Sequence, residues 1–344
     1  MRSSITRKRS LRGAVAICVS LLPLNTTAEP FGGSELGDPS SFSSLEALQG
    51  RAWDKAILNP FAILYASRKS VYNMEPIRPL AIAIARRENS SVRFLLSKKT
   101  FDKVTKDPSA LVGLQVLATG SSASHMHLLE CLAYYELKPE QMEIGFANQT
   151  TSMATLDSGK TEAAVLWRSF DRRAEDGKSK AKELKCGGEP SLLMPALWVT
   201  RSDLLLEPED GRRQKNLREL ALRVATELGK WEQIRRVPEP QAKKLIEWYR
   251  ARGVTIEMAE ALQEIDERRP PSFDEQLTLF HSPRQDPSVA AILDQLSDYL
   301  VSSGALRLDE KPDADTVVDG SVLDYISADP SLAAVARGET PPVQ

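Results

Sequence analysis

The sequence has few of the residues that bind metals or act as nucleophiles. Its 344 residues include three histidines and three cysteines, and these are not clustered at the spacing of zinc ligands. His125 and His127 are two positions apart, whereas a helical zinc pair is four apart. Ser124 and His125 are adjacent, so on a helix they point about 100° apart and form no nucleophile–base pair. We therefore expect no enzymatic activity, no metal and no cofactor.

The sequence also lacks an excess of charge of either sign. It has 45 Lys and Arg against 47 Asp and Glu, a net charge of -2. There is no zinc-finger or RNA-recognition motif, so we expect no nucleic-acid binding. With 42% apolar residues, the chain is long enough to form two globular lobes.

No stretch approaches the twenty apolar residues of a membrane span. The most apolar run, residues 14–24, follows a segment rich in arginine and precedes Thr26-Thr27-Ala28, a passable cleavage site. Residues 1–28 are therefore predicted to be a signal peptide, which predicts a periplasmic location. Alternatively, this apolar run is a buried first strand of the fold. Residues 29–43 are expected to be a flexible leader.

Two cysteines, Cys131 and Cys186, remain after cleavage of the predicted signal peptide. In an oxidising compartment they could form a disulfide. Alternatively, Cys131 is a buried thiol on a helix and Cys186 is a loop thiol beside Gly187. Sequence separation says nothing about their distance in space, so both alternatives stay open.

Short apolar strands alternate with amphipathic helices over the first two thirds of the chain, and the remainder is helical. This order predicts an α/β fold with mostly parallel sheets. We assign residues 44–110 and 201–330 to lobe I, residues 111–200 to lobe II, and residues 331–344 to a disordered tail. Strands are expected near residues 55–58, 80–85, 92–96, 142–146, 163–167 and 192–200.

A possible anion site follows the apolar stretch at residues 116–118. There the sequence reads Gly120-Ser121-Ser122-Ala123-Ser124, and a predicted helix follows. Serine hydroxyls and unpaired backbone N–H groups meet at such a helix start, where the helix dipole favours an anion. This pattern indicates binding rather than catalysis.

Three segments together resemble extracytoplasmic solute-binding proteins of the nitrate/sulfonate/taurine class, which serve ABC importers. LVGLQV at residues 111–116 resembles that family's D-L-K-G-K-K-V, and GSSASH at residues 120–125 its G-S-T/S-x-H helix start. LDSGKTEAAVLW at residues 156–167 resembles L-x-x-G-x-x-D-A-A-x-x-W. The resemblance implies a type II periplasmic-binding-protein fold, in which two lobes close on a small anionic or polar organic ligand. It also implies a monomer that interacts with an ABC transporter permease.

The same resemblance implies which residues contact the ligand. Several of them have a structural alternative: Ser121 and Ser122 cap a helix, Asn59 and Pro60 end a strand, and Trp167 fills the core. Arg168 stands where the family often has a carboxylate, and it could bind an anion or lie on the surface. If residues 1–28 are a signal peptide, the block of about forty residues with which that family begins is expected to be largely missing, and a sensor or scaffold that binds a partner is the alternative function. The implied ligand contacts are Ser121, Ser122, Ser124, His125, Asn59, Pro60, Asn148, Gln149, Trp167 and Arg168.

Overall fold

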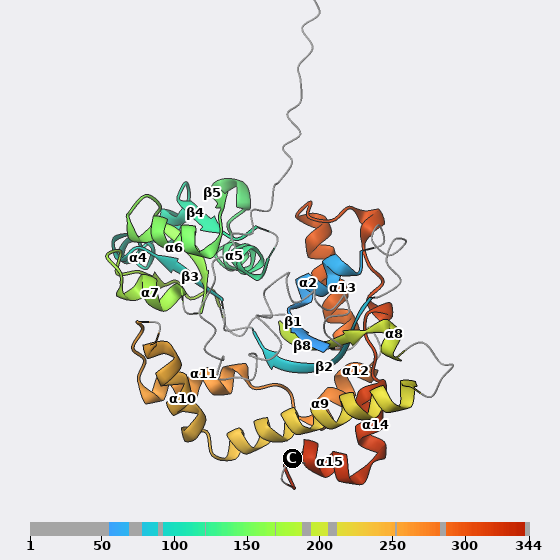
Figure 1. Ribbon diagram of the computed structural model, residues 1–344. Coiled ribbons are helices and arrows are strands. Elements are labelled where there is room, and N and C mark those ends of the chain that lie inside the picture. Colours follow the sequence, from blue (N-terminus) through green and yellow to red (C-terminus); the bar gives the residue numbers. More distant parts are fainter. Residues whose placement is uncertain are drawn as a thin grey trace, which may run out of the picture.

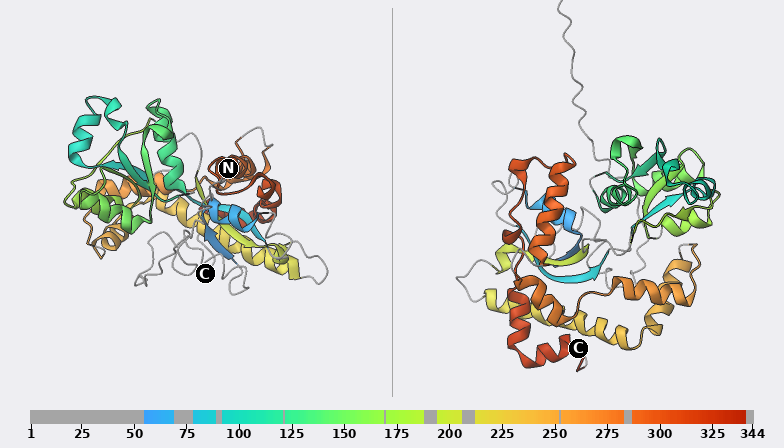
Figure 2. Two further views of the ribbon diagram at one scale, coloured as in Figure 1. Left: turned by 90° about the horizontal axis from the view of Figure 1, so that it is seen from above. Right: turned by 180° about the vertical axis from the view of Figure 1, so that it is seen from behind.

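The protein has two α/β lobes (Figure 1), and Figure 2 shows the same two lobes from above and from behind. The computed structural model describes residues 55–68, 78–88, 92–120, 122–168, 170–187, 194–205, 212–251, 253–282 and 287–340. The predicted signal peptide, the alternative first strand, the predicted leader and Ser121 lie outside these residues. No helix within the described part of the chain is long and apolar enough to cross a membrane.

Lobe I is built on a three-stranded sheet in the order β1-β8-β2. Its strands are β1 (Lys55–Leu58), β2 (Pro79–Arg87) and β8 (Pro195–Arg201). The central β8 runs antiparallel to both neighbours, with Ile57 opposite Trp198. All seven residues of β8 are buried because helices cover both faces of the sheet.

Different helices cover the two faces of the lobe I sheet. Neighbouring residues on β2 point to opposite faces, so Leu80 joins one apolar cluster and Ala81 the other. One face packs against α2 (Pro60–Ala66) and α13 (Val289–Ser302). The other packs against α9 (Arg212–Arg236), α12 (Phe273–His281), α14 (Ser321–Ala328) and α15 (Pro330–Ala336). The short elements of this lobe are α8 (Ser202–Leu205), η4 (Leu308–Glu310) and η5 (Ala314–Thr316).

Lobe II is built on a five-stranded sheet in the order β5-β4-β6-β3-β7. The strands β4 (Gln115–Ala118), β5 (Glu143–Phe146) and β6 (Ala163–Trp167) are parallel, whereas β3 (Val92–Leu96) pairs antiparallel with both β6 and β7 (Lys182–Glu183). One face is covered by α5 (Ala123–Tyr134), the other by α6 (Gln149–Asp157) and α7 (Phe170–Asp176). The remaining elements are α4 (Lys98–Val104), η2 (Pro108–Leu111) and η3 (Pro139–Gln141).

The observed sheets differ from the prediction in direction and in lobe boundaries. The lobe I sheet is antiparallel, because β8 runs antiparallel to both of its neighbours. The lobe II sheet is mixed, because β3 runs antiparallel to its neighbours while β4, β5 and β6 are parallel. The predicted boundary after residue 110 falls too late, because β3 already hydrogen-bonds within the lobe II sheet. The predicted end of lobe II at residue 200 also falls too late, because β8 belongs to lobe I.

The C-terminal residues contribute to the core instead of forming the predicted tail. Residues 330–336 form α15, and its Leu332 and Val335 are buried against α9 and α14. Gly229 of α9 permits this contact, because a side chain there would collide with the backbone carbonyl of Val335. The predicted disordered tail at residues 331–344 is therefore wrong for residues 331–336.

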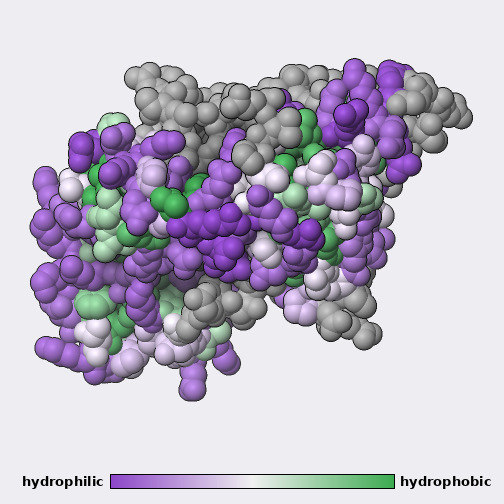
Figure 3. All heavy atoms as spheres, turned by 90° about the horizontal axis from the view of Figure 1, so that it is seen from below, coloured by the Kyte–Doolittle hydropathy of each residue, from purple (hydrophilic) through white to green (hydrophobic). Residues whose placement is uncertain are grey.

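A helical hairpin extends from α9 toward lobe II. It consists of α10 (Glu239–Arg250) and α11 (Met258–Arg268), which lie below lobe II in Figure 1. The hairpin has its own apolar cluster, which includes Trp231 of α9 together with Leu245 and Ile265. The face seen from below, where α9 lies, is largely hydrophilic with small apolar patches (Figure 3). The hairpin thus has a small apolar core of its own, and it lies between α9 and lobe II.

Candidate functional site

The predicted anion site lies at the start of α5, where β4 ends. Ser122 is the N-cap residue: its Oγ accepts from the backbone N–H of Ser124 at 3.2 Å. The same hydroxyl donates to the carbonyl of Thr119 at 2.6 Å. These contacts agree with the capping interpretation of Ser122. The positive end of the α5 dipole still lies here.

Ser124 has a structural role inside lobe II. Its side chain is fully buried, and its Oγ donates to the carbonyl of Val165 at 2.8 Å. It also accepts from the backbone N–H of Thr119 at 3.2 Å. The hydroxyl therefore joins the end of β4 to the middle of β6. Connecting these two strands is a structural role that the sequence did not predict for Ser124.

His125 is the predicted site residue that reaches from lobe II to lobe I. Its ring makes edge contacts with Phe146 of β5, at a centroid distance of 4.9 Å, and with Tyr299 of α13, at 5.9 Å. Burial lowers the pKa of His125, which favours the neutral imidazole near neutral pH. Among the described residues, its Nδ1 has no hydrogen-bond partner.

Tyr299 continues this contact into lobe I. Its ring makes an edge contact with Phe61 of α2 at a centroid distance of 6.0 Å. Its hydroxyl is buried and has no hydrogen-bond partner in the described part of the chain. Burial raises the pKa of Tyr299, so the hydroxyl stays protonated. Sequence reasoning missed Tyr299, because an aromatic residue within an amphipathic helix normally indicates core.

The first turn of α2 supplies the predicted lobe I residues. Asn59 caps this helix, with its Oδ1 accepting from the N–H of Ala62 at 2.9 Å. Pro60 is buried at the first helical position, where a missing N–H costs nothing. Phe61 follows and contacts Tyr299. The starts of α2 and α5 are therefore connected through Tyr299.

The two predicted contacts after β5 serve the structure of lobe II. Asn148 is exposed and caps α6, accepting from the N–H of Thr151 at 2.8 Å. Gln149 is buried: its Nε2 donates to Thr119 Oγ1 at 2.8 Å, and its Oε1 accepts from the N–H of Trp167 at 2.8 Å. Gln149 thus joins the ends of two strands, which is a different role from the predicted ligand contact.

Gln149→Met is expected to lower the free energy of unfolding by about 2 kcal/mol, because the backbone N–H of Trp167 at the end of β6 loses its hydrogen-bond acceptor. Denaturant unfolding measures this change. The matched control is Gln263→Met, because Gln263 is an exposed residue of α11. The control should change stability by less than about 0.5 kcal/mol. Equal effects of the two variants would contradict the structural role of Gln149.

Arg168 is paired with carboxylates of α11 instead of being available for an anion. Its guanidinium contacts Glu267, and its Nε lies 3.9 Å from Glu264 Oε2. Arg168 is 7% exposed, so the surface interpretation does not fit. The neighbouring Trp167 is half-buried and packs against the lobe II core, in agreement with its structural alternative.

Arg168 belongs to a cluster of charged residues between lobe II and the α10–α11 hairpin. Arg172 contacts Glu260 at 2.9 Å, and Tyr249 donates to Glu264 at 2.9 Å. Glu260, Glu264 and Glu267 lie on one side of α11, a spacing that was visible in the sequence. These contacts connect lobe II to the hairpin through charge instead of apolar packing.

Asp171 is the most buried carboxylate beside this cluster. Its side chain is fully buried, with Oδ2 at 3.0 Å from Arg93 Nε. Burial raises the pKa of Asp171 to about 6, although nearby Arg168 and Arg93 lower it. The Asp171 carboxylate therefore lies in the protein interior and not on a solvated face of α7.

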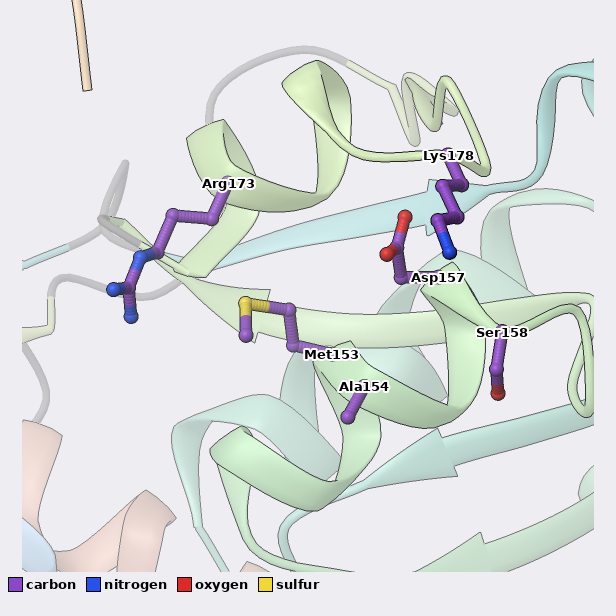
Figure 4. A pocket seen from close by; sticks show the side chains of 6 residues that line it. All are labelled: Met153, Ala154, Asp157, Ser158, Arg173 and Lys178. Carbon is purple, nitrogen blue, oxygen red and sulfur yellow. The ribbon is translucent and has the colours of Figure 1, made fainter. Parts of the chain in front are cut away.

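Two surface pockets lie away from these residues. One, of about 270 Å³, lies in lobe II and is lined by α6, α7 and the segment after α7 (Figure 4). In it, Lys178 points toward Asp157, while Arg173 points away. The other, of about 540 Å³, lies in lobe I beside α12. Neither pocket is lined by a predicted site residue.

Solved structures with a similar arrangement of lobes include binding proteins for sulfonates and for nitrate. The aliphatic sulphonate-binding protein of Escherichia coli matches with a TM-score of 0.58 at 16% identity, over 80% of this chain and 79% of that one. The alkanesulfonate-binding protein of Xanthomonas axonopodis pv. citri, bound to MOPS, matches with a TM-score of 0.53 at 14% identity, over 85% and 86%. The chain has the type II periplasmic-binding-protein fold. The periplasmic nitrate-binding protein of Synechocystis PCC 6803 shares this fold, with a TM-score of 0.52 at 11% identity, over 85% and 77%.

A sequence comparison also finds a similar protein that binds a small molecule in the periplasm. The taurine-binding periplasmic protein of Escherichia coli K12 is 28% identical over 134 residues, which cover 36% of this chain. The chain spans 41% of the length of that relative. No family model matches the sequence. These similar proteins are named for what they bind and not for a reaction, which agrees with the prediction that the chain is not an enzyme.

Proposed function

We propose that this protein is an exported solute-binding protein. It captures a small anionic or polar organic ligand, such as a sulfonate, nitrate or taurine-like compound, between its lobes. It works in the periplasm as a monomer and delivers the ligand to an ABC importer. The fold and the names of the similar proteins support this proposal.

The observation that carries the proposal is the contact of His125 with Tyr299 across the two lobes. His125 Nδ1 and the Tyr299 hydroxyl are buried polar groups without a partner among the described residues. Buried polar groups are nearly always hydrogen-bonded, so two such groups at one interface call for an explanation. A ligand with oxygen atoms would satisfy both.

The contact between His125 and Tyr299 could bind an anion through neutral hydrogen-bond donors, without a buried positive charge in the protein. A neutral imidazole and a protonated phenol each have a hydrogen-bond donor to offer. The N-terminus of α5 adds a partial positive charge at the same point. Because the donors come from both lobes, a bound anion would favour the closed arrangement over an open one.

A thermal-shift screen of the chain from Glu29 tests the proposal. The panel contains nitrate, sulfate, alkyl and aryl sulfonates, taurine, pyrimidines and amino acids. A ligand at one hundred times its Kd adds about 2.7 kcal/mol to the free energy of unfolding. A folded protein that responds to no compound would contradict solute binding and favour the sensor or scaffold alternative.

Tyr299→Phe is expected to weaken binding of a screened ligand about tenfold, because a hydrogen bond to an anion is lost. Stability without ligand should not fall, because the hydroxyl has no partner among the described residues. Calorimetric titration measures the affinity. Tyr134→Phe is the matched control, because Tyr134 is 57% exposed on lobe II. Unchanged affinity in Tyr299→Phe would remove this residue from the site.

A further inference from the structure

A cluster of one histidine and two cysteines lies in lobe II, beside the middle of α5. Cys131 of α5 forms a disulfide with Cys186, which lies after β7. The side-chain donor atoms of His127, Cys131 and Cys186 all lie within 4.8 Å of one another. The disulfide settles the alternatives that the sequence left open. The cluster was not visible in the sequence, because Cys186 lies 55 positions from Cys131.

The two ring nitrogens of His127 face different groups: one faces Cys131 and the other faces Glu130. His127 and Cys131 are four residues apart, so they lie on the same side of α5. The Nε2 of His127 lies 3.6 Å from Cys131 Sγ, while its Nδ1 lies 3.9 Å from Glu130 Oε2. Metal-binding histidines commonly direct their second nitrogen toward a carboxylate, which orients the ring.

We propose that reduction of the Cys131–Cys186 disulfide creates a binding site for Zn²⁺ formed by His127, Cys131 and Cys186. A dithiol supplies two electrons and two protons to the sulfur–sulfur bond and is itself oxidised to a disulfide. Each protein thiol then releases its proton to solvent as its sulfur binds zinc. The imidazole nitrogen supplies the third bond, and water or a carboxylate completes a tetrahedral site.

The backbone around the cysteines allows this exchange of a covalent bond for a metal. Two sulfurs bound to one zinc lie about 3.8 Å apart, as follows from zinc–sulfur bonds of about 2.3 Å in a tetrahedron. Cys131 is fully buried on a helix, so Cys186 must move. Cys186 precedes Gly187, whose φ of +82° is one that glycine adopts freely. Zinc would then keep α5 linked to this segment when the disulfide is absent.

The test is a metal titration of the full chain before and after reduction. A phosphine reduces the disulfide and is removed under argon, and Co²⁺ is then added as a spectroscopic probe, followed by Zn²⁺. We expect one metal ion per reduced chain, with a thiolate-to-cobalt charge-transfer band that Zn²⁺ abolishes. The oxidised chain should show neither.

Variants distinguish this site from adventitious binding. Cys186→Ser leaves one thiolate, so the charge-transfer band should not reach the intensity of a site with two thiolates. His127→Ala should weaken zinc binding. Glu130→Gln should weaken it about tenfold or more, because the ring loses its orienting carboxylate. His281→Ala is the matched control, because His281 lies on α12 and pairs with Asp324 at 2.9 Å. It should leave zinc affinity unchanged.

Three results would overturn the proposal. The first is a reduced, folded chain that binds no cobalt or zinc. The second is equal zinc affinity of the reduced parent chain, His127→Ala and Cys186→Ser. The third is a reduced chain that loses its near-ultraviolet circular dichroism and does not regain it when zinc is added. The last result would show that the cluster exists only with the disulfide.

Discussion

Replacement of Cys131 by Ala together with Cys186 by Ser is expected to lower the free energy of unfolding by about 4 kcal/mol. The disulfide joins residues 55 positions apart, and its loss gives that loop many more conformations in the unfolded state. It also links α5, on one face of the lobe II sheet, to the segment after the edge strand β7. Urea unfolding of oxidised parent and double variant measures the difference.

A reductant supplies the control for this prediction. It should lower the unfolding midpoint of the parent chain toward that of the double variant, and it should leave the variant unchanged. A ligand that binds between the lobes should still stabilise the variant, because the disulfide lies within lobe II. A difference below about 1 kcal/mol between parent and variant would show that the unfolded chain is already restricted in this region.

Local sequence pattern was sufficient to find most elements of the fold. The predicted strands at residues 55–58, 92–96 and 163–167 coincide with β1, β3 and β6. Each is a short apolar run bounded by polar or turn residues, so its identity depends only on nearby residues. The long helix α9 was indicated by apolar residues at intervals of three and four.

The order and direction of the strands could not be predicted in the same way. β8 lies between β1 and β2, and nothing in its own residues specifies those neighbours. The apolar pattern of a buried strand is the same for parallel and antiparallel pairing. Residues 331–336 were assigned to a tail because Gly338 and two prolines follow them, although Leu332 completes the lobe I core.

The candidate site shows a similar division. The sequence indicated the helix start at Ser122, whose side chain caps α5. Asn59 and Asn148 also cap their helices, although they were predicted as ligand contacts. The same polar groups cap helices and bind ligands, so pattern alone does not separate the two roles. Tyr299 and the carboxylates paired with Arg168 come from distant segments that only the folded chain brings together.

Arg168→Met is expected to lower the free energy of unfolding by about 3 kcal/mol, because it removes the buried positive charge that pairs with Glu264 and Glu267. The Arg168 side chain is 4% exposed, and that of Glu264 is 3% exposed. Glu264 retains Arg268 at 3.0 Å, which places the loss at the lower end of the range for buried pairs. Lys98→Met is the control: Lys98 pairs with Asp102 on the surface and should contribute less than about 0.5 kcal/mol.

A double-mutant cycle determines whether this loss comes from the contact between Arg168 and Glu264. Glu264→Gln keeps an acceptor for Tyr249 while removing the charge. If the two side chains interact, the double variant should lose less than the sum of the single losses, by about 1 kcal/mol or more. Additive losses would contradict a direct interaction. A favourable coupling would mean that lobe II is held on the α10–α11 hairpin, so closure of the lobes must either move the hairpin with lobe II or break these ion pairs.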